Sequence, residues 1–524
     1  MPLQYKIECY LSGVVDGPNA SITISDRLDR LKRWQAARES LTWTKAQMDF
    51  EGYEGTWFTC KAFGPVFCEK MGKELAVVRP ASALRGVTAK EWSFNLPYEP
   101  VGYACDYSQH LLVIVEQTEP KRENAWTIHL WSFLTGSEHP DCSAMEDLTA
   151  EFRPPRAPGH ENEESDSDEP YEVNPNDDEV EFFLDVQVVG SLLALTCQVY
   201  VMEMGSYCTE TWVWNWKTGK LLLDFPKIIK DGMSHKSYFP LLDDKHILVP
   251  VEHPGIGRGT FGVNGVAVVP VYPAKSRRQT YEAAVKTATV VLALPGLQSR
   301  ISGGDVRLAF APVAPPHQSW DPQPIFAPDP RLALLRIVLS TDHYSSGGGP
   351  ARMLFAVPVH VLLDALAAPR AGTKTTIVPW ARWAPHAHVA KLRAVWYDCA
   401  VAATWCVREA REVKHGGHER TIFFTLSDFA TRRSLRRSQA AAKGAETDEP
   451  GAEVVLDPEP LEQQDRFVQK PMPVLPHRRH QDAFKLRYFA DRIALGDYYV
   501  VVHRSKGQLG GTMPAPDYRE VFSI

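Results

Sequence analysis

The chain is built from short apolar runs separated by turn residues. Residues 111–115 and 192–199 are two such runs, and each follows a shorter apolar segment across a polar turn. A short, continuous apolar run between turn signals is typical of a strand that is covered on both faces. The pattern therefore predicts a mostly β fold in which many short strands lie between neighbouring sheets.

One short motif occurs twice and suggests how these strands are organised. Trp131-Ser132-Phe133-Leu134-Thr135-Gly136 recurs as Trp214-Asn215-Trp216-Lys217-Thr218-Gly219, and the two copies begin 83 residues apart. An acidic stretch of 44 residues, 138–181, lies between them. Subtracting these 44 residues from 83 leaves 39, close to the period of about 40–45 residues of a four-stranded propeller blade. The motif therefore predicts a β-propeller.

Other parts of the chain show the same order of strands. Together with a unit near the N-terminus, they predict roughly seven four-stranded blades, with six or eight as alternatives because the repeat length is irregular. Closing the sheets into a ring would leave only short edges exposed. The strand-bearing units lie at 101–133, 184–216, 238–271, 332–359, 394–426 and 484–502.

The N-terminal segment has a different pattern. Residues 25–48 are predicted to form a helix, because Ser25 can cap its start and Leu28, Leu31 and Trp34 recur at helical spacing. This helix is expected to stand apart from the strands that follow it.

These patterns predict the organisation of the chain. Residues 1–50 are expected to form a helical lead-in, and residues 51–524 the propeller. Two segments inside the propeller, about 138–181 and 431–481, are expected to be disordered inserts. The first is rich in Glu, Asp, Pro and Asn, and the second is a mixed-charge stretch with Ala, Pro and Glu blocks. Neither has enough apolar surface to order itself.

Composition narrows the classes of partner. The 524 residues carry a net charge of −7, and no basic stripe indicates a nucleic-acid partner. No apolar run approaches the roughly 18 residues of a membrane span, and the first residues do not resemble a signal peptide. The nine cysteines form no CxxC pair, which is typical of reduced thiols. We therefore expect a cytoplasmic or nuclear protein that contacts neither membrane nor nucleic acid.

Three motifs are candidates for a cofactor or metal site. Residues 257–262 match GxGxxG, but the strand-like segment after them does not provide the helix that a dinucleotide site requires. His415 with His418, and His477 with His480, are expected to be solvated loop residues, because a zinc site needs three or four protein ligands. No cofactor or metal is therefore predicted.

No residues suggest a catalytic centre. The chain has no GxSxG elbow, and no pair of carboxylates is placed by a recognisable element. Four cysteines in apolar strand regions are expected to be buried, inert thiols: Cys60, Cys68, Cys399 and Cys406. We therefore expect a non-enzymatic protein. A propeller hydrolase or lyase is the least favoured alternative, since it would need ionisable side chains that converge at the central channel.

Two kinds of residue are candidates for recognition. Ser165 and Ser167 lie among Glu and Asp residues, which marks them as candidate phosphorylation sites within an otherwise solvated acidic linker. The 14 tryptophans are expected to pack mainly between blades, and a few to line a recognition surface on one face of the ring.

The chain resembles the F-box proteins of mushroom-forming fungi. The resemblance lies in Tyr5-Lys6-Ile7-Glu8 with Gly13-Val14-Val15-Asp16-Gly17, in Ser25-Asp26-Arg27-Leu28-Asp29-Arg30-Leu31 with Trp43, and in Gly102-Tyr103 with Ser108-Gln109-His110-Leu111-Leu112-Val113-Ile114-Val115-Glu116. In that family, an F-box binds the adaptor subunit of a cullin-based ubiquitin ligase. A propeller-like region follows it and is taken to recruit substrates.

The resemblance implies a function for the propeller. We expect a protein-interaction module similar to the substrate-recruiting region of an F-box ubiquitin-ligase receptor. The F-box itself would precede Leu3, so the ligase adaptor is expected as a partner only if an F-box precedes Met1. The alternative is a propeller scaffold unrelated to ubiquitin transfer.

Overall fold

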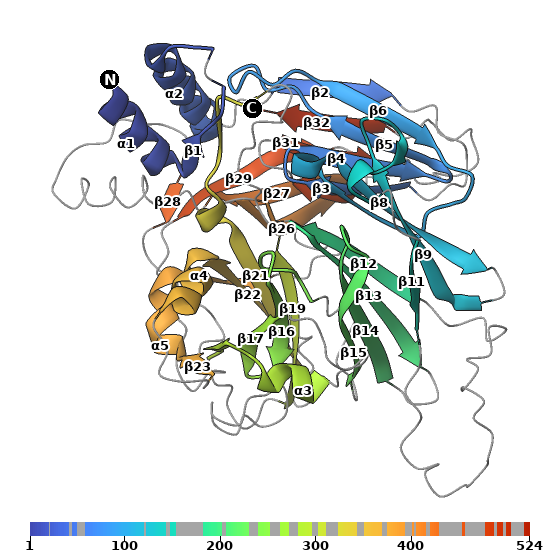
Figure 1. Cartoon of the computed structure of the whole chain (residues 1–524). Helices are drawn as coiled ribbons and strands as arrows, with labels where there is room; N and C mark the ends of the chain where they lie inside the picture. The colour runs from blue at the N-terminus through green and yellow to red at the C-terminus, as the bar shows by residue number, and fades with distance from the viewer. Residues whose placement is uncertain are drawn as a thin grey trace, which may run out of the picture.

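Antiparallel sheets make up most of this computed structural model (Figure 1). Within the described part of the chain, five sheets have four strands, two have five, and one small sheet has two. The described residues are 1–19, 21–40, 44–49, 58–119, 122–142, 147–152, 182–201, 206–229, 239–251, 263–271, 281–295, 302–310, 323–342, 351–368, 375–392, 401–402, 405–414, 420–428, 453–455, 477–486, 490–495, 499–504 and 518–523.

The first three sheets are built from consecutive strands. The first contains β3 (Phe58–Phe63), β4 (Val66–Met71), β5 (Glu74–Arg79) and β6 (Lys90–Asn95). The second contains β7 (Gly102–Asp106), β8 (Leu111–Glu119), β9 (Arg122–Ser132), β10 (Ser137–Glu138) and β11 (Leu148–Glu151). The third contains β12 (Phe182–Val189), β13 (Leu192–Val201), β14 (Ser206–Asn215) and β15 (Lys220–Ile229).

The remaining large sheets take strands from more distant segments. One contains β16 (His246–Val251), β17 (Gly265–Pro270), β18 (Val290–Ala293) and β23 (Thr376–Val378). The next contains β19 (Ser302–Phe310), β21 (Leu334–Asp342), β22 (Ala351–Pro358) and β24 (His388–Leu392). Another contains β25 (Val401–Ala402), β26 (Trp405–Lys414), β27 (Arg420–Asp428), β28 (Glu453–Val455) and β29 (His477–Leu486). The last contains β30 (Ala490–Leu495), β31 (Tyr499–Arg504), β32 (Tyr518–Ser523) and β2 (Thr44–Asp49).

The first strands of successive sheets lie next to one another. Strand β7 packs against β3 and β12, β19 packs against β16 and β25, and β30, from the last sheet, packs against β3, from the first. This arrangement places the first strands at the centre and the later strands toward the outside. The prediction of a mostly β propeller is therefore confirmed.

The ends of the chain meet in the last sheet. Strand β2 pairs antiparallel with β32, from Thr44 opposite Ser523 to Asp49 opposite Tyr518. Figure 1 shows the blue β2 beside the red β32. The N-terminal strand thus supplies the outer edge of a sheet whose other three strands come from the C-terminus.

The prediction of roughly seven four-stranded blades is wrong. Only five of the described sheets have four strands. Strand β11 adds a second partner to β9, and β28 adds a fifth strand beside β29. Insertions between repeats thus contribute strands of their own, which a count of repeats does not reveal.

Strand β8 shows why the central strands read as continuous apolar runs. Residues 111–115 of β8 are fully buried. Leu111, Val113 and Val115 pack in the cluster shared with the β12–β15 sheet, and Leu112 and Ile114 pack in the cluster shared with the β3–β6 sheet. Both faces of the strand are therefore covered, as the sequence predicted, and apolar burial on each face contributes about 25 cal/mol per Å².

The repeated motif occupies equivalent turns in two sheets. Phe133 and Trp216 are fully buried, and their amides donate to the carbonyls of His110 and Ser191 in the preceding turn of the same sheet. Gly136 and Gly219 end the two motifs with φ values of 67° and 66°, a left-handed conformation that favours glycine. The motif therefore places a buried aromatic side chain between two neighbouring turns of the same sheet.

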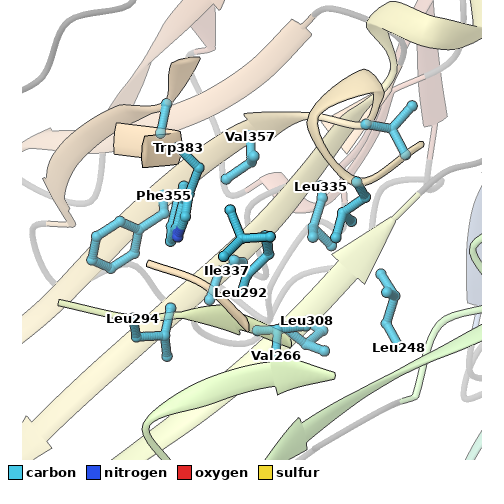
Figure 2. Packing of buried hydrophobic residues seen from close by; sticks show 14 of the residues in the cluster. Leu248, Val266, Leu292, Leu294, Leu308, Leu335, Ile337, Phe355, Val357 and Trp383 are labelled. Carbon is cyan, nitrogen blue, oxygen red and sulfur yellow. The ribbon is translucent and has the colours of Figure 1, made fainter. Parts of the chain in front are cut away.

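Two neighbouring sheets are interlocked by a crossover. After β22 the chain forms α4 (His360–Ala367) and then β23, which pairs in parallel with β18 of the preceding sheet. It continues through α5 (Trp380–Trp383) and returns as β24 beside β22. Figure 2 shows the shared core, in which Trp383 lies near Phe355. The Trp383 indole donates to the Ala293 carbonyl at 2.9 Å, so α5 is tied to both sheets.

The predicted disordered inserts are partly ordered. Within 138–181, strand β11 pairs with β9, and Phe152 beyond it is buried; the segment 153–181 lies outside the described residues. Within 431–481, β28 pairs with the start of β29. The prediction of complete disorder is wrong for these pieces, because pairing with an existing strand compensates for their polar composition.

The N-terminal helix is shorter than predicted. The helix expected over 25–48 is α2 (Ile24–Ser40), and β2 follows it as a strand. The first residues also form a helix, α1 (Pro2–Ser12), which the sequence pattern did not reveal. Pairing with β32, far away in sequence, decides the conformation of residues 44–49, and tertiary contacts of this kind override local propensity.

Replacing Trp383 tests the interlocking core. Trp383→Ala removes a fully buried indole that contacts both sheets, so we expect a loss of about 3–5 kcal/mol in the free energy of unfolding. Urea denaturation followed by fluorescence measures the change. The control is Leu134→Ala at an exposed turn position, where we expect a change within about 0.5 kcal/mol. Equal effects of the two substitutions would contradict the interlock.

Thiol reactivity tests the burial of the cysteines. Burial raises the pKa of Cys9 and Cys142 to about 11 and that of Cys208 to about 12. The thiolate is the nucleophile, so at pH 7.5 these thiols should alkylate far more slowly in the native protein than in urea, and faster as the pH rises. Peptide mass spectrometry after timed iodoacetamide treatment measures each rate, with the half-buried Cys60 as the faster comparator. Rapid native labelling of Cys208 would contradict the structure.

Candidate protein-interaction surface

The N-terminal segment folds into a small helical unit. It contains α1, the short strand β1 (Val14–Asp16) and α2. Gly13 ends α1 in the left-handed conformation, with φ of 67°, and its amide bonds back to carbonyls of the last helical turn. This turn redirects the chain into β1, so that the two helices lie against each other.

A partly buried polar network joins the parts of this unit. The Tyr5 hydroxyl donates to Asp16 Oδ1 at 2.9 Å, and Arg27 Nη1 donates to the same oxygen at 2.7 Å. Burial raises the pKa of Tyr5, so its hydroxyl stays protonated and acts as a donor. The Gln35 amide also donates to Ser12 across the helix pair. The inner face of α1 is therefore fixed by both β1 and α2.

Strand β1 attaches the unit to the propeller. It pairs antiparallel with β20 (Phe326–Pro328), which precedes β21 of the interlocked sheets. Hydrogen bonds flank the pair: the Asp329 amide donates to the Gly13 carbonyl, and the Gly17 amide to the Ile325 carbonyl, both at 2.9 Å. A Cβ on Gly17 would lie 1.9 Å from the Pro324 carbonyl oxygen, so this close approach requires glycine.

A loop of the first sheet completes the attachment. Arg85, in the loop between β5 and β6, donates through Nε to the Phe326 carbonyl at 3.1 Å, and its own carbonyl accepts from the Ile325 amide at 3.0 Å. Trp34 of α2 meets the Phe326 ring edge-on at 5.3 Å. The loop of the first sheet thus holds β20, the strand to which the helical unit is joined. The expectation that the N-terminal helix stands apart is wrong, because its apolar face is covered by β20.

Exposed apolar side chains are concentrated on this unit. Among the residues whose burial the structure describes, seven large apolar side chains are exposed, and five of them lie in residues 1–24. Those five are Met1, Leu3, Ile7, Tyr10 and Ile24. The other two, Val101 and Leu134, lie on the propeller. Exposed apolar groups gathered in one place mark interaction sites more often than scattered ones do.

Three of these side chains form a stripe along α1. Leu3, Ile7 and Tyr10 are exposed to 72%, 39% and 57%, and their spacing of four and three residues places them on one face. We call these three residues the α1 stripe. On the opposite face Tyr5 and Cys9 are buried. The helix therefore has an exposed apolar face opposite its buried one.

One cation borders the α1 stripe. Lys6 is exposed and lies three residues after Leu3 and four before Tyr10. The acidic residue of α1, Glu8, is partly buried and lies 3.5 Å from the Gln35 amide nitrogen. The outward surface of α1 is thus apolar with a positive margin.

The residues that the sequence singled out for chemistry lie elsewhere. Ser165 and Ser167, the glycine-rich residues 257–262 and the His415–His418 pair lie outside the described residues. His477 and His480 lie in β29 rather than in the polar loop that was expected, because this segment pairs with β27 and β28. Within the described residues, no group of three or more His, Cys, Asp or Glu side chains is arranged to hold a metal ion.

The tryptophans of the described core do pack inside the molecule. Trp212, Trp214 and Trp216 lie in the cluster between the second and third sheets, and Trp380 and Trp383 lie in the interlocking core. Trp396 lies outside the described residues. The recognition surface is therefore not built from these buried indoles. None of the described helices combines the length and apolar character needed to cross a bilayer.

The sequence analysis missed the α1 stripe. Two signals for α1 were present: Pro2 at the first helical position and Gly13 just past the last one, the usual places for these residues. No local signal separates Leu3 and Ile7 from Tyr5 and Cys9, since all four can be buried. Only the positions of α2 and β1 decide which pair faces outward.

Comparisons with known proteins do not assign this chain to a family. No family model matches it, and no curated protein does. Among solved structures, it is similar to "Drosophila Semaphorin 1b, extracellular domains 1-2" at 9% identity and a TM-score of 0.33, over 91% of this chain and 86% of that chain. It is also similar to "Drosophila Plexin A in complex with Semaphorin 1b" at 9% identity and a TM-score of 0.27, over the same shares. Similarity this low carries no argument, so the description of the fold rests on strand topology.

Gly17→Ala tests how the helical unit is attached. The added Cβ would collide with the Pro324 carbonyl, so we expect β1 to separate from β20 and the Gly17 and Asp329 amides to lose their protection from hydrogen exchange. Exchange measured by mass spectrometry on peptides that cover these residues checks this. The control is Gly72→Asn, where a Cβ meets nothing within 4 Å and asparagine tolerates the φ of 57°. Unchanged exchange in the Gly17 variant would contradict the docking geometry.

Proposed function

We propose that this chain is a non-enzymatic protein-interaction module in which the propeller holds the N-terminal helical unit and the α1 stripe binds a protein partner. The observation that carries the proposal is the concentration of exposed apolar side chains on residues 1–24. The propeller supports it as a rigid scaffold, because β20 and the Arg85 loop fix the position of the helices.

In its finer form, the proposal is that the module recruits substrates in the manner of an F-box ubiquitin-ligase receptor. What supports this form is the resemblance in residues 5–8 with 13–17, in residues 25–31 with Trp43, and in residues 102–103 with 108–116. Residues 5–8 lie in α1 and residues 14–16 form β1, so part of the resemblance falls on the helical unit itself. The alternative is an interaction scaffold with no connection to ubiquitin transfer.

Affinity capture with matched variants tests the proposal. The full chain and its triple variant Leu3→Ser, Ile7→Ser, Tyr10→Ser are expressed in the native cells, and the retained proteins are quantified by mass spectrometry. We expect at least one abundant partner to fall about tenfold or more with the triple variant, because losing apolar anchors at an interface costs more than about 1.4 kcal/mol. These positions are exposed, so stability should change by less than about 0.5 kcal/mol per substitution.

The control is the double variant Val101→Ser, Leu134→Ser, which removes two exposed apolar side chains from the described part of the propeller. Partners that survive in the control but not in the triple variant define the binding surface. Identical partner lists for all three proteins would overturn the assignment of function to α1. Retention of a cullin and its adaptor supports the receptor form, and partners without them favour the alternative scaffold.

A further inference from the structure

The chemistry of the α1 stripe identifies the class of partner, and this inference rests on the proposed function. We infer that the stripe binds an amphipathic α-helix that carries acidic side chains beside its apolar face. Three observations carry the inference: the shape of the stripe, its fixed conformation and the sign of the charge at its margin.

The shape fits a helix. From Leu3 to Tyr10 the stripe extends seven residues along α1, which is about 10 Å at 1.5 Å per residue. It is straight and one side chain wide, so a second helix laid along it can cover all three anchors by packing ridges into grooves. Anchors at i, i+4 and i+7 are the pattern through which helices recognise apolar surfaces.

The stripe is already in its binding conformation. Tyr5 is held by Asp16, Ser12 by Gln35, and α2 by its contact with Phe326. A partner helix therefore meets a helix that is already formed and held in place, and preorganisation of this kind strengthens binding.

The charge at the margin favours a carboxylate partner. Lys6 lies beside the stripe, while Glu8 faces Gln35. Lys32 and Arg33 are also exposed on α2, although Asp26 and Asp29 are exposed there too, so Lys6 provides the discriminating charge. Opposite charges across the rim of an interface select partners and suppress wrong ones.

The same charge disfavours a second copy of this chain. A two-fold interface brings the same surface from both molecules together, so two Lys6 side chains would share one rim. A separate helix with acidic margins does not meet this repulsion.

Binding of three labelled peptides to the full chain tests the inference. The first is a designed helical peptide with a leucine face flanked by glutamates, the second has lysines in place of the glutamates, and the third is a shuffled form of the first. Fluorescence anisotropy measures the dissociation constants. We expect the acidic peptide to bind at least about tenfold more tightly than either of the others, since each tenfold step corresponds to 1.4 kcal/mol.

Two variants locate the site. The triple stripe variant should bind the acidic peptide at least about tenfold more weakly than the parent chain does. The K6E variant should bind the lysine peptide more tightly than the acidic one. The Val101→Ser, Leu134→Ser variant should bind like the parent chain. Circular dichroism and thermal melting of each variant confirm that it is folded.

Several results would overturn the inference. They are equal binding of the acidic and lysine peptides, unchanged binding by the triple variant, or a dimer in light scattering that the triple variant abolishes. The peptide result is separable from the proposed function: if native partners depend on the stripe in the capture experiment while the acidic peptide does not bind, the function stands and the acidic-helix inference fails.

Discussion

The pairing of β2 with β32 is the contact on which the rest of the architecture depends. It joins Thr44–Asp49 to Tyr518–Ser523 and completes the sheet that also contains β30 and β31. Strand β30 in turn packs against β3, so this sheet connects the last part of the chain to the first. A ring of sheets leaves only short edges exposed, and without β2 the backbone edge of β32 would be unpaired. Strand β2 and the C-terminal strands β30, β31 and β32 are therefore parts of one structural element.

This closure also explains the position of the interaction surface. The segment that supplies β2 follows directly from the helical unit, whose other anchor is the β1–β20 pair. The unit is thus held at β1 by β20 and, beyond α2, by the closing strand. Arg85 and Trp34 add contacts to the same β20 backbone and ring. The exposed stripe of α1 is consequently a rigid part of the propeller, although it lies in the first residues of the chain.

The sequence predicted what local patterns encode. Residues 111–115 read as a doubly covered strand because burial on both faces leaves no polar position. The Phe133 and Trp216 turns recur because the second and third sheets each bury an aromatic side chain at the same turn. It did not predict β2, since Thr44–Asp49 is a strand only because of a partner about 470 residues away. It also missed β23 and the outward face of α1, because a crossover and the choice between Leu3 and Tyr5 depend on where other elements lie. The elements that the sequence did not predict are those whose conformation depends on partners distant in the chain.

The crossover through α4 and α5 has a consequence for how the protein is made. Strand β18 is complete at Ala293, but its outer neighbour β23 begins only at Thr376, after three strands of the next sheet. During synthesis on the ribosome, the apolar edge of β18 therefore remains unpaired while β19, β21 and β22 emerge. Unpaired edges of this kind are templates for aggregation. The demand for chaperone protection should accordingly be greatest while this middle portion of the nascent chain is being extended, and should end when Trp383 docks against Ala293.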